Sequence, residues 1–265
     1  MMLPMAQRVP ETIEPGFRAF VARAFGEEGR AWIAALPEAH ATLATRWHLE
    51  LGPELPGGLI SCVREARRSD GRAAILKIGA SSLRTRDEIG ALRAWAGRGA
   101  PTLLDADEEL GAMLLERIQP GMHPADAGAA AVATVLHALH ISPLAGLTLL
   151  GEIVRRRIQR AVAEERASDA RSTWALARVA ELERDPPPAV LLHGDFDERN
   201  LLVCDRRGLC AIDPLPAAGD AAYDAAYWVH GNRRPGRRAR LDALVELGFD
   251  RTRVRDWAAV IGVHG

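Results

Sequence analysis

The sequence predicts an α+β protein, in which a small antiparallel sheet with a helix precedes a larger and mainly helical part. Residues 47–117 hold short apolar runs separated by turn residues, a pattern typical of strands. Residues 126–182 instead place apolar side chains at helical spacing. We therefore expect an N-terminal lobe over residues 1–118 and a C-terminal lobe over residues 119–265.

The N-terminal lobe is expected to begin with amphipathic helix up to about Thr45, interrupted where Pro37 breaks the pattern. Strands then follow one another with a single helix between them, and Asp70-Gly71 marks a hairpin turn. The expected strands cover residues 47–51, 59–65, 73–78, 102–104 and 112–117, with a loop over residues 52–58, a helix over residues 88–95 and an acidic turn over residues 105–109.

The C-terminal lobe should contain three long helices, a short hairpin, a further helix and two short helices before the last residue. The expected helices cover residues 126–140, 149–165 and 169–182, the hairpin strands residues 201–204 and 209–212, and the next helix begins at Ala221.

Composition indicates an ordinary enzyme-sized protein. Its 265 residues are 48% hydrophobic and 26% charged, enough to bury a sizeable core in two lobes. A net charge of −1 gives no general attraction to nucleic acid or membranes, and the arginine cluster of residues 233–240 lacks the interleaved aromatics of a nucleic-acid site. The sequence does not indicate an oligomeric state.

The cysteines and the chain start point to a cytoplasmic protein. Cys62, Cys204 and Cys210 fall inside predicted strands, which suits reduced core residues, and no Cys/His cluster has zinc spacing. We also expect no signal peptide and no membrane-spanning segment, since the apolar start lacks a basic leader and no apolar run is long enough.

The most informative stretch is residues 191–203, which places Asp195 and Asn200 in one short loop between two apolar runs. Asp213 follows after the predicted hairpin, which returns it toward Asn200. One carboxylate could orient an acceptor hydroxyl and receive its proton, while an amide oxygen and a second carboxylate hold Mg²⁺ against the phosphates of ATP. Such residues are also common as loop caps, but the whole pattern predicts a small-molecule kinase.

A phosphate clamp is expected upstream, at Lys77 and Glu88. Lys77 lies in the apolar run Ala74-Ile75-Leu76-Lys77-Ile78, and a buried ammonium group needs an anionic partner. Glu88 opens the predicted helix and is the candidate partner for holding the α and β phosphates. The alternatives are a solvated edge lysine and a first-turn helix acid.

Two further backbone segments are candidate nucleotide contacts. Gly57 and Gly58 could let the backbone approach phosphates, although paired glycines are more often a turn. The backbone from Glu116 to Ile118 precedes the predicted hinge Gln119-Pro120-Gly121 and could meet an adenine ring. No Walker signature occurs, which excludes a P-loop nucleotidase.

These motifs give the chain a resemblance to the aminoglycoside/hydroxyurea antibiotic-resistance phosphotransferases, and within them to the streptomycin 6-phosphotransferases. The resemblance covers nearly the whole chain. It is carried, in order, by Gly26-Glu27-Glu28-Gly29-Arg30-Ala31-Trp32-Ile33, Leu55-Pro56-Gly57-Gly58, Ala74-Ile75-Leu76-Lys77, Leu114-Leu115-Glu116-Arg117, His193-Gly194-Asp195 and Ala211-Ile212-Asp213-Pro214.

The resemblance implies a bilobal protein-kinase-like fold and transfer of the γ-phosphate of ATP to a hydroxyl of an antibiotic. It assigns Asp195 as the catalytic residue, Asn200 and Asp213 as Mg²⁺ ligands, and Lys77 as the phosphate-binding lysine. Relatives usually carry more helix after the segment that ends near Arg238. An alternative is therefore a nucleotide-binding pseudokinase with an incomplete acceptor pocket.

The acceptor can be argued only from charge. Streptomycin carries guanidinium groups, so its site should present acids, and carboxylates pair with guanidinium in a bidentate manner. Four acids are candidates, namely Asp197, Glu198, Asp220 and Asp224. Asp220 could instead cap the next helix and Asp224 could be its first-turn acid. Hydroxyurea or another small neutral acceptor would need no such acids.

His193 precedes the catalytic loop, and we expect it to fix the loop through backbone hydrogen bonds rather than to transfer protons.

Overall fold

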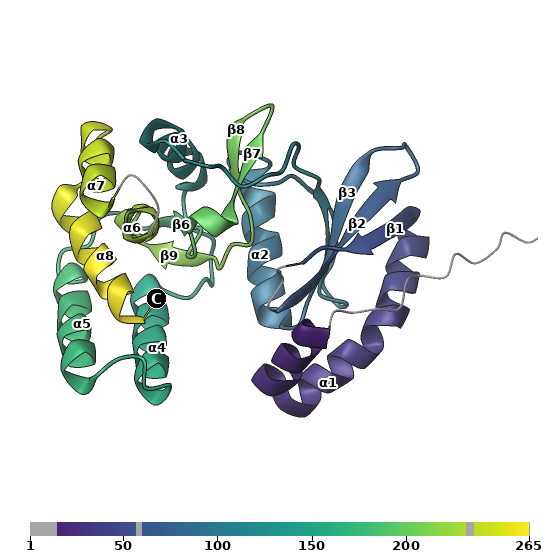
Figure 1. Cartoon of the computed structure of the whole chain (residues 1–265), viewed down its shortest axis with the longest axis horizontal. Coiled ribbons are helices and arrows are strands. Elements are labelled where there is room, and N and C mark those ends of the chain that lie inside the picture. Colours follow the sequence, from purple (N-terminus) through teal and green to yellow (C-terminus); the bar gives the residue numbers. More distant parts are fainter. Residues whose placement is uncertain (1–14, 57–59, 232–235, 265) are drawn as a thin grey trace, which may run out of the picture. The chain divides into compact units, whose positions relative to one another are not determined.

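The structure is a computed structural model that describes residues 15–56, 60–231 and 236–264 (Figure 1). Contacts divide the chain into two compact units. The first runs to Ile89 and includes Leu103–Arg117, and the second comprises Gly90–Thr102 and everything from Ile118. The predicted division at residues 118/119 placed residues 90–102 in the first lobe, whereas their contacts belong to the second unit.

The first unit is built on a five-stranded antiparallel sheet with the strand order β1-β2-β3-β5-β4 (Figure 1). Residues Asp70 and Gly71 make the β2–β3 turn, where Gly71 has a φ of 80°. The strands are β1 (Leu49–Glu54), β2 (Ser61–Arg68), β3 (Ala73–Gly79), β4 (Leu103–Asp107) and β5 (Ala112–Glu116).

Helix α1 (Pro15–Arg46) packs against this sheet through one apolar face (Figure 1). Its buried residues Ile33 and Leu36 join the core formed with β3. The predicted break at Pro37 is wrong, because the helix continues through this residue and is interrupted instead at Gly26, with φ 60° and ψ −129°. Pro37 is exposed, so the ring lies on the face that makes no core contacts.

Other boundaries in the first unit also differ from the prediction. Strand β1 extends through Gly52-Pro53, which were expected to be loop, and an edge strand tolerates proline because one side needs no ladder bonds. Strand β4 extends into the expected acidic turn as far as Asp107. Helix α2 (Ser82–Trp95) starts a turn and a half before Glu88, so Glu88 lies within the helix and does not open it.

The second unit is mainly helical, and α8 contacts α4, α5, α6 and α7 (Figure 1). The Ser168 side chain caps α5 by accepting a hydrogen bond from the Arg171 N–H, which accounts for the correctly predicted start of this helix. The helices are α3 (Ala129–Leu139), α4 (Leu150–Ala163), α5 (Asp169–Leu182), α6 (Ala222–His230), α7 (Arg237–Glu246) and α8 (Arg251–His264).

Two small antiparallel sheets of two strands each lie in the second unit. Strand β6 (Val190–Leu192) pairs with β9 (Ala217–Gly219), and β7 (Leu201–Cys204) pairs with β8 (Gly208–Ala211). Of the two, only the β7–β8 sheet is a hairpin. The short 3₁₀ helix η1 (Glu198–Asn200) lies directly before β7. The predicted hairpin after Asn200 is therefore confirmed.

The predicted α+β class, with an antiparallel sheet first and helices after it, is confirmed. No helix within the described ranges is both long and apolar enough to cross a lipid bilayer.

Candidate active site

Asp195 and Asn200 meet at the two ends of the loop that follows β6. The Asn200 Nδ2 amide donates to the Asp195 backbone carbonyl at 2.8 Å and to its Oδ2 at 3.0 Å. Both side chains are partly buried. Because both contacts use Nδ2, the Asn200 amide oxygen points away from this bond and is available as an acceptor or metal ligand.

The β7–β8 hairpin brings Asp213 to the same part of the unit. Leu201 pairs with Ala211, and the Ile212 N–H donates to the Asn200 carbonyl at 2.8 Å. Asp213 is exposed and has a φ of 57°, a left-handed conformation that few residues other than glycine adopt. Because Asp213 directly follows Ile212, it lies close to Asn200, at the end of the Asp195 loop.

The donor set fits a hard cation. Asn200 and Asp213 supply an amide oxygen and a carboxylate, which are the ligand types that Mg²⁺ takes alongside water and phosphate oxygens. Among the residues that the structure describes, there is no group of three or more His, Cys, Asp or Glu side chains that could hold a metal ion. A site of this composition would need the phosphate oxygens of a nucleotide to complete it.

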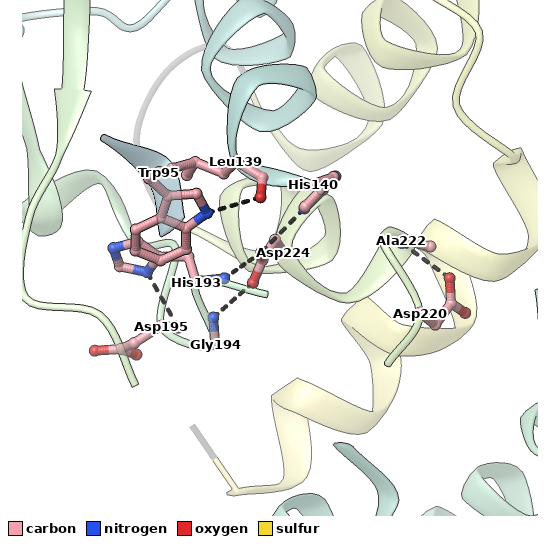
Figure 2. A network of polar contacts seen from close by, with 9 residues as sticks. All are labelled: Trp95, Leu139, His140, His193, Gly194, Asp195, Asp220, Ala222 and Asp224. Carbon is pink, nitrogen blue, oxygen red and sulfur yellow. Dashed lines mark hydrogen bonds and ion pairs between the residues drawn. The ribbon is translucent and has the colours of Figure 1, made fainter. Parts of the chain in front are cut away.

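His193 fixes the loop from inside. Its Nε2 lies 3.0 Å from the Ile212 carbonyl, and its ring stacks on Trp95 with centroids 6.4 Å apart. Trp95 is itself held by a 2.8 Å bond from its Nε1 to the Leu139 carbonyl (Figure 2). Burial lowers the pKa of His193, which favours the neutral ring and a positioning role.

Asp224 on α6 holds the backbone directly before Asp195. Figure 2 shows its carboxylate accepting from the N–H of His193 at 2.8 Å and from the N–H of Gly194 at 2.9 Å. Its Oδ2 also lies 3.1 Å from His140 Nε2. Burial alone would raise the pKa of Asp224, but the hydrogen bond and charge of His140, with the His193 and Gly194 contacts, lower it.

Gly194 has a conformation that other residues rarely adopt, with φ at 75°. A Cβ atom there would lie 2.0 Å from the Leu215 carbonyl oxygen. Leu215 cannot move away freely, because its N–H donates to the His193 carbonyl at 2.8 Å. The loop can therefore turn tightly into Asp195 only with glycine at this position.

The electrostatic surroundings of Asp195 favour a proton-accepting carboxylate. Burial raises its pKa, and the nearby Asp197 raises it further, while His193, Arg157 and the Asn200 amide oppose the rise. A carboxylate that is partly desolvated but still hydrogen-bonded accepts a proton more readily than one in water.

Arg157 on α4 is a residue of this site that we did not single out from the sequence. It donates to the Gly194 carbonyl at 3.2 Å and contacts the hydroxyls of Tyr223 and Tyr227. A usable signal existed, since Arg157 falls in the helical stripe of Val154 and Ala161, both of which are buried. A charged residue in an apolar stripe needs partners inside the protein.

Lys77 and Glu88 belong to the first unit and form a buried ion pair. Lys77 Nζ lies 2.6 Å from Glu88 Oε1, and the two residues are only 6% and 7% exposed. The antiparallel β3 and β5 strands place Lys77 opposite Met113. Such a pair holds a lysine in one orientation, as a phosphate-binding lysine requires.

The remaining candidate nucleotide contacts lie in different parts of the chain. Gly57 and Gly58 lie outside the described residues. Glu116 ends β5 in the first unit, where it pairs with Ala74. Ile118 is buried in the second unit, in a cluster with Cys204 and Cys210.

The expected hinge segment adds to the β7 strand. The Gly121 N–H donates to the Val203 carbonyl at 3.1 Å, and the Asp205 N–H donates to the Gln119 carbonyl at 2.9 Å. The segment at residues 119–121 is therefore anchored by backbone bonds to the strand that follows Asn200.

The four acids expected to meet a cationic acceptor are mostly bound within the protein. Glu198 is buried and lies 2.6 Å from Arg240 Nη2. Asp220 accepts from the Ala222 N–H at 3.0 Å, as shown in Figure 2, and from Trp257 and Arg253, both at 2.7 Å.

Three of the four acids therefore have partners inside the protein, and their contact with a substrate stays a prediction. Asp224 lies in the first turn of α6, which is the alternative role considered for it, whereas Asp220 precedes the N-cap residue Ala221 and accepts from the Ala222 N–H. Glu198 is held by Arg240. Asp197 is the fourth acid, and its partly exposed side chain pairs with Arg199.

Known proteins are similar to this chain over most of its length. The model of the family described as "Aminoglycoside/hydroxyurea antibiotic resistance kinase" matches residues 46–264. The chain is 37% identical to a streptomycin 6-kinase of Streptomyces glaucescens, over 94% of this chain and 86% of that protein. It is 33% identical to a hydroxyurea phosphotransferase of Kitasatospora aureofaciens, over 88% of this chain and 72% of that protein.

Solved structures share the fold at lower identity. The apoenzyme of macrolide 2'-phosphotransferase MphH from Brachybacterium faecium has a TM-score of 0.60 and 23% identity, over 84% of this chain and 88% of that one. The GDP complex of aminoglycoside 2'-phosphotransferase-IIIa has a TM-score of 0.57 and 15% identity, over 84% and 87%. The fold is thus that of kinase-like phosphotransferases, and the chain belongs to the aminoglycoside/hydroxyurea antibiotic resistance kinase family.

Proposed function

We propose that this protein transfers the γ-phosphoryl group of ATP to a hydroxyl group of an antibiotic, with streptomycin as the first acceptor to test. The observation that supports this most is the bonded pair of Asp195 and Asn200, with Asp213 attached through the Ile212 backbone bond. This set contains the proton acceptor and the oxygen ligands that phosphoryl transfer requires.

Each residue has a distinct proposed task. Asp195 would orient the acceptor hydroxyl and take its proton at a carboxylate oxygen. Asn200 and Asp213 would hold Mg²⁺, which, when bound, neutralises charge on the phosphates. Lys77, oriented by Glu88, would bind the α and β phosphates, and Gly57 and Gly58 would approach them through the backbone.

The adenine ring would meet the backbone near Glu116 and Ile118. We also propose that the protein acts in the cytoplasm, which its three free and buried cysteines support.

Hydroxyurea is the second candidate acceptor, and one observation favours it. Glu198, Asp220 and Asp224 are engaged by protein groups, so Asp197 alone of the expected acids keeps a partly exposed carboxylate near the loop. A small neutral acceptor needs no array of acids, whereas a guanidinium-bearing one gains orientation from each free carboxylate.

A panel of acceptors separates these proposals. Purified protein is incubated with ATP, Mg²⁺ and either streptomycin, other aminoglycosides or hydroxyurea, and each acceptor is examined by mass spectrometry for one added phosphoryl group. Product with streptomycin supports the first proposal, and product with hydroxyurea alone supports the second. Nucleotide binding with no product across the panel would favour a pseudokinase and contradict both.

A further inference from the structure

Arg157 lies on α4, far from Asp195 in the sequence, yet its side chain contacts the loop at Gly194, the residue directly before Asp195. Its Nη2 donates to the Gly194 carbonyl at 3.2 Å, and its Nη1 donates to the Tyr223 hydroxyl at 2.9 Å. Nη1 also donates to the Tyr227 hydroxyl. One guanidinium group therefore joins α4, α6 and the loop.

Gly194 is held on both of its peptide groups. Its N–H is bound by Asp224 Oδ1 at 2.9 Å, and its carbonyl accepts from Arg157. The carbonyl belongs to the peptide that links Gly194 to Asp195, so the Arg157 bond restrains the rotation that would redirect the Asp195 side chain. A glycine with φ at 75° has no side chain to provide that restraint itself.

The guanidinium is a suitable group for this task. Burial alone would lower the pKa of Arg157, but Tyr223, Tyr227 and Asp195 raise it, so the charge is retained next to the loop. A planar guanidinium can donate in two directions at once, which a lysine ammonium at the end of a flexible chain cannot do at fixed geometry.

Tyr223 and Tyr227 differ in their exposure to solvent. Tyr223 is fully buried, whereas Tyr227 is partly exposed, and their rings meet edge to face with centroids 5.2 Å apart. Burial raises the pKa of Tyr227, and the charges of Tyr223 and Asp195 raise it further, while the charge of Arg157 opposes the rise. Arg157 thus orients the hydroxyl of the partly exposed Tyr227 as well as the loop.

We propose that Arg157 is a positioning residue for phosphoryl transfer, which fixes the peptide before Asp195 through the Gly194 carbonyl and ties that peptide to the Tyr223 and Tyr227 hydroxyls of α6. This inference rests on the proposed function. A residue that only packs α4 against α6 would affect stability without acting selectively on turnover.

The test compares Arg157→Met and Arg157→Lys with Arg156→Met. Arg156→Met is the matched control, because it removes the same charge from the same helix. The Arg156 side chain is exposed and pairs with the exposed Glu152. For Arg157→Met we expect kcat to fall by about 100-fold, because small displacements of a catalytic group have effects of this size. The KM for ATP should stay within about twofold, because the hydrogen bonds of Arg157 go to the Gly194 carbonyl and the hydroxyls of Tyr223 and Tyr227, which are not proposed nucleotide ligands.

Arg157→Lys keeps the charge and guards against a variant that fails to fold. It should show a kcat between those of wild type and Arg157→Met, since one ammonium cannot serve the carbonyl and both hydroxyls. A wild-type kcat in Arg157→Lys and Arg157→Met would overturn the proposal. So would a parallel loss of turnover, ATP binding and folding in Arg157→Lys.

Hydrogen exchange separates this inference from the proposed function. In Arg157→Lys the amides of residues 193–200 should exchange faster than in wild type, while Arg156→Met leaves them unchanged. If the wild-type protein phosphorylates none of the acceptors, this loop-specific change would still support the positioning role of Arg157. Unchanged exchange in the loop would overturn it, whatever the acceptor.

Discussion

The Asn200 side chain amide donates to both the backbone carbonyl and the carboxylate of Asp195, at 2.8 and 3.0 Å. The residue proposed to hold the metal is therefore also the residue that orients the proposed proton acceptor. A substitution of Asn200 therefore affects both the proposed metal site and the orientation of Asp195. The two effects can be separated by a variant that keeps an oxygen ligand but loses the N–H donor.

Asn200→Ala and Asn200→Asp should differ in their Mg²⁺ dependence. Asn200→Ala loses the oxygen ligand and the N–H donors, so both kcat and Mg²⁺ affinity should fall, with kcat down by about 100-fold or more. Asn200→Asp keeps an oxygen ligand but places a second carboxylate against Asp195, so kcat should fall while Mg²⁺ still binds. Turnover measured against Mg²⁺ concentration checks this, and near-normal turnover in Asn200→Asp would show that the bond to Asp195 is dispensable.

The Lys77–Glu88 pair should contribute much more to the unfolding free energy than a partly exposed ion pair of the same unit. Lys77→Met leaves a buried Glu88 carboxylate without its closest partner, which should lower the unfolding free energy by about 3 kcal/mol. The control is Arg117→Met, whose pair with Glu65 is partly exposed, and which should cost at most about 1 kcal/mol.

Calorimetric titration with ATP completes this test. If Lys77 binds phosphates, Lys77→Met should weaken ATP binding in protein that is still folded, and Arg117→Met should not. Equal ATP affinity in wild type and Lys77→Met would remove Lys77 from the nucleotide site.

Gly194→Ala and Gly208→Ala compare two glycines with almost the same backbone conformation. Their φ values are 75° and 76°, but a Cβ at Gly194 would lie 2.0 Å from the Leu215 carbonyl, whereas nothing lies within 4 Å at Gly208. Gly208→Ala should cost only the left-handed strain of about 1 kcal/mol. Gly194→Ala should cost at least about 3 kcal/mol in urea unfolding, because backbone must move. Equal costs would mean that the Leu215 contact does not constrain the loop.

His40 should make the first unit sensitive to mild acid. Burial, followed by the charge of Arg64, lowers the pKa of His40 from 6.5 to about 4. Because the unfolded chain then binds the proton more readily, stability is complete above about pH 6.5 and is lost as the pH falls toward 4. The loss between about pH 7 and about pH 5 should be about 2 kcal/mol.

Urea unfolding at the two pH values tests this, with His40→Leu as the comparison. The variant removes the titrating group and should lose less stability between them. An identical pH dependence in both proteins would assign the acid sensitivity to other groups.

Elements with a strong local signal were predictable from the sequence. Helix α5 was placed correctly because residues 169–182 carry a regular apolar pattern, and the β7–β8 hairpin because Asp205 to Gly208 is a strong turn. The start of α2 was missed because residues 81–87 are mostly polar and give no periodicity, although Thr85 bonds to the Ser81 carbonyl one turn earlier.

Tertiary context decided the rest. Pro37 is tolerated in α1 because the adjacent Ile33 and Leu36 are buried while the proline ring is exposed, which no local rule for proline anticipates. Among the site residues, spacing identified Asp195, Asn200 and Asp213 as candidates. The partners that hold the loop could not be found this way, because Arg157 and Asp224 lie on helices distant in sequence.

The most direct test of the account is a comparison of wild type with Asp195→Ala for phosphoryl transfer and nucleotide binding together. With ATP, Mg²⁺ and the acceptor that wild type phosphorylates, Asp195→Ala should form no detectable product while binding ATP as wild type does, since Asp195 is proposed to serve the acceptor hydroxyl. Unaltered turnover in Asp195→Ala would contradict the account.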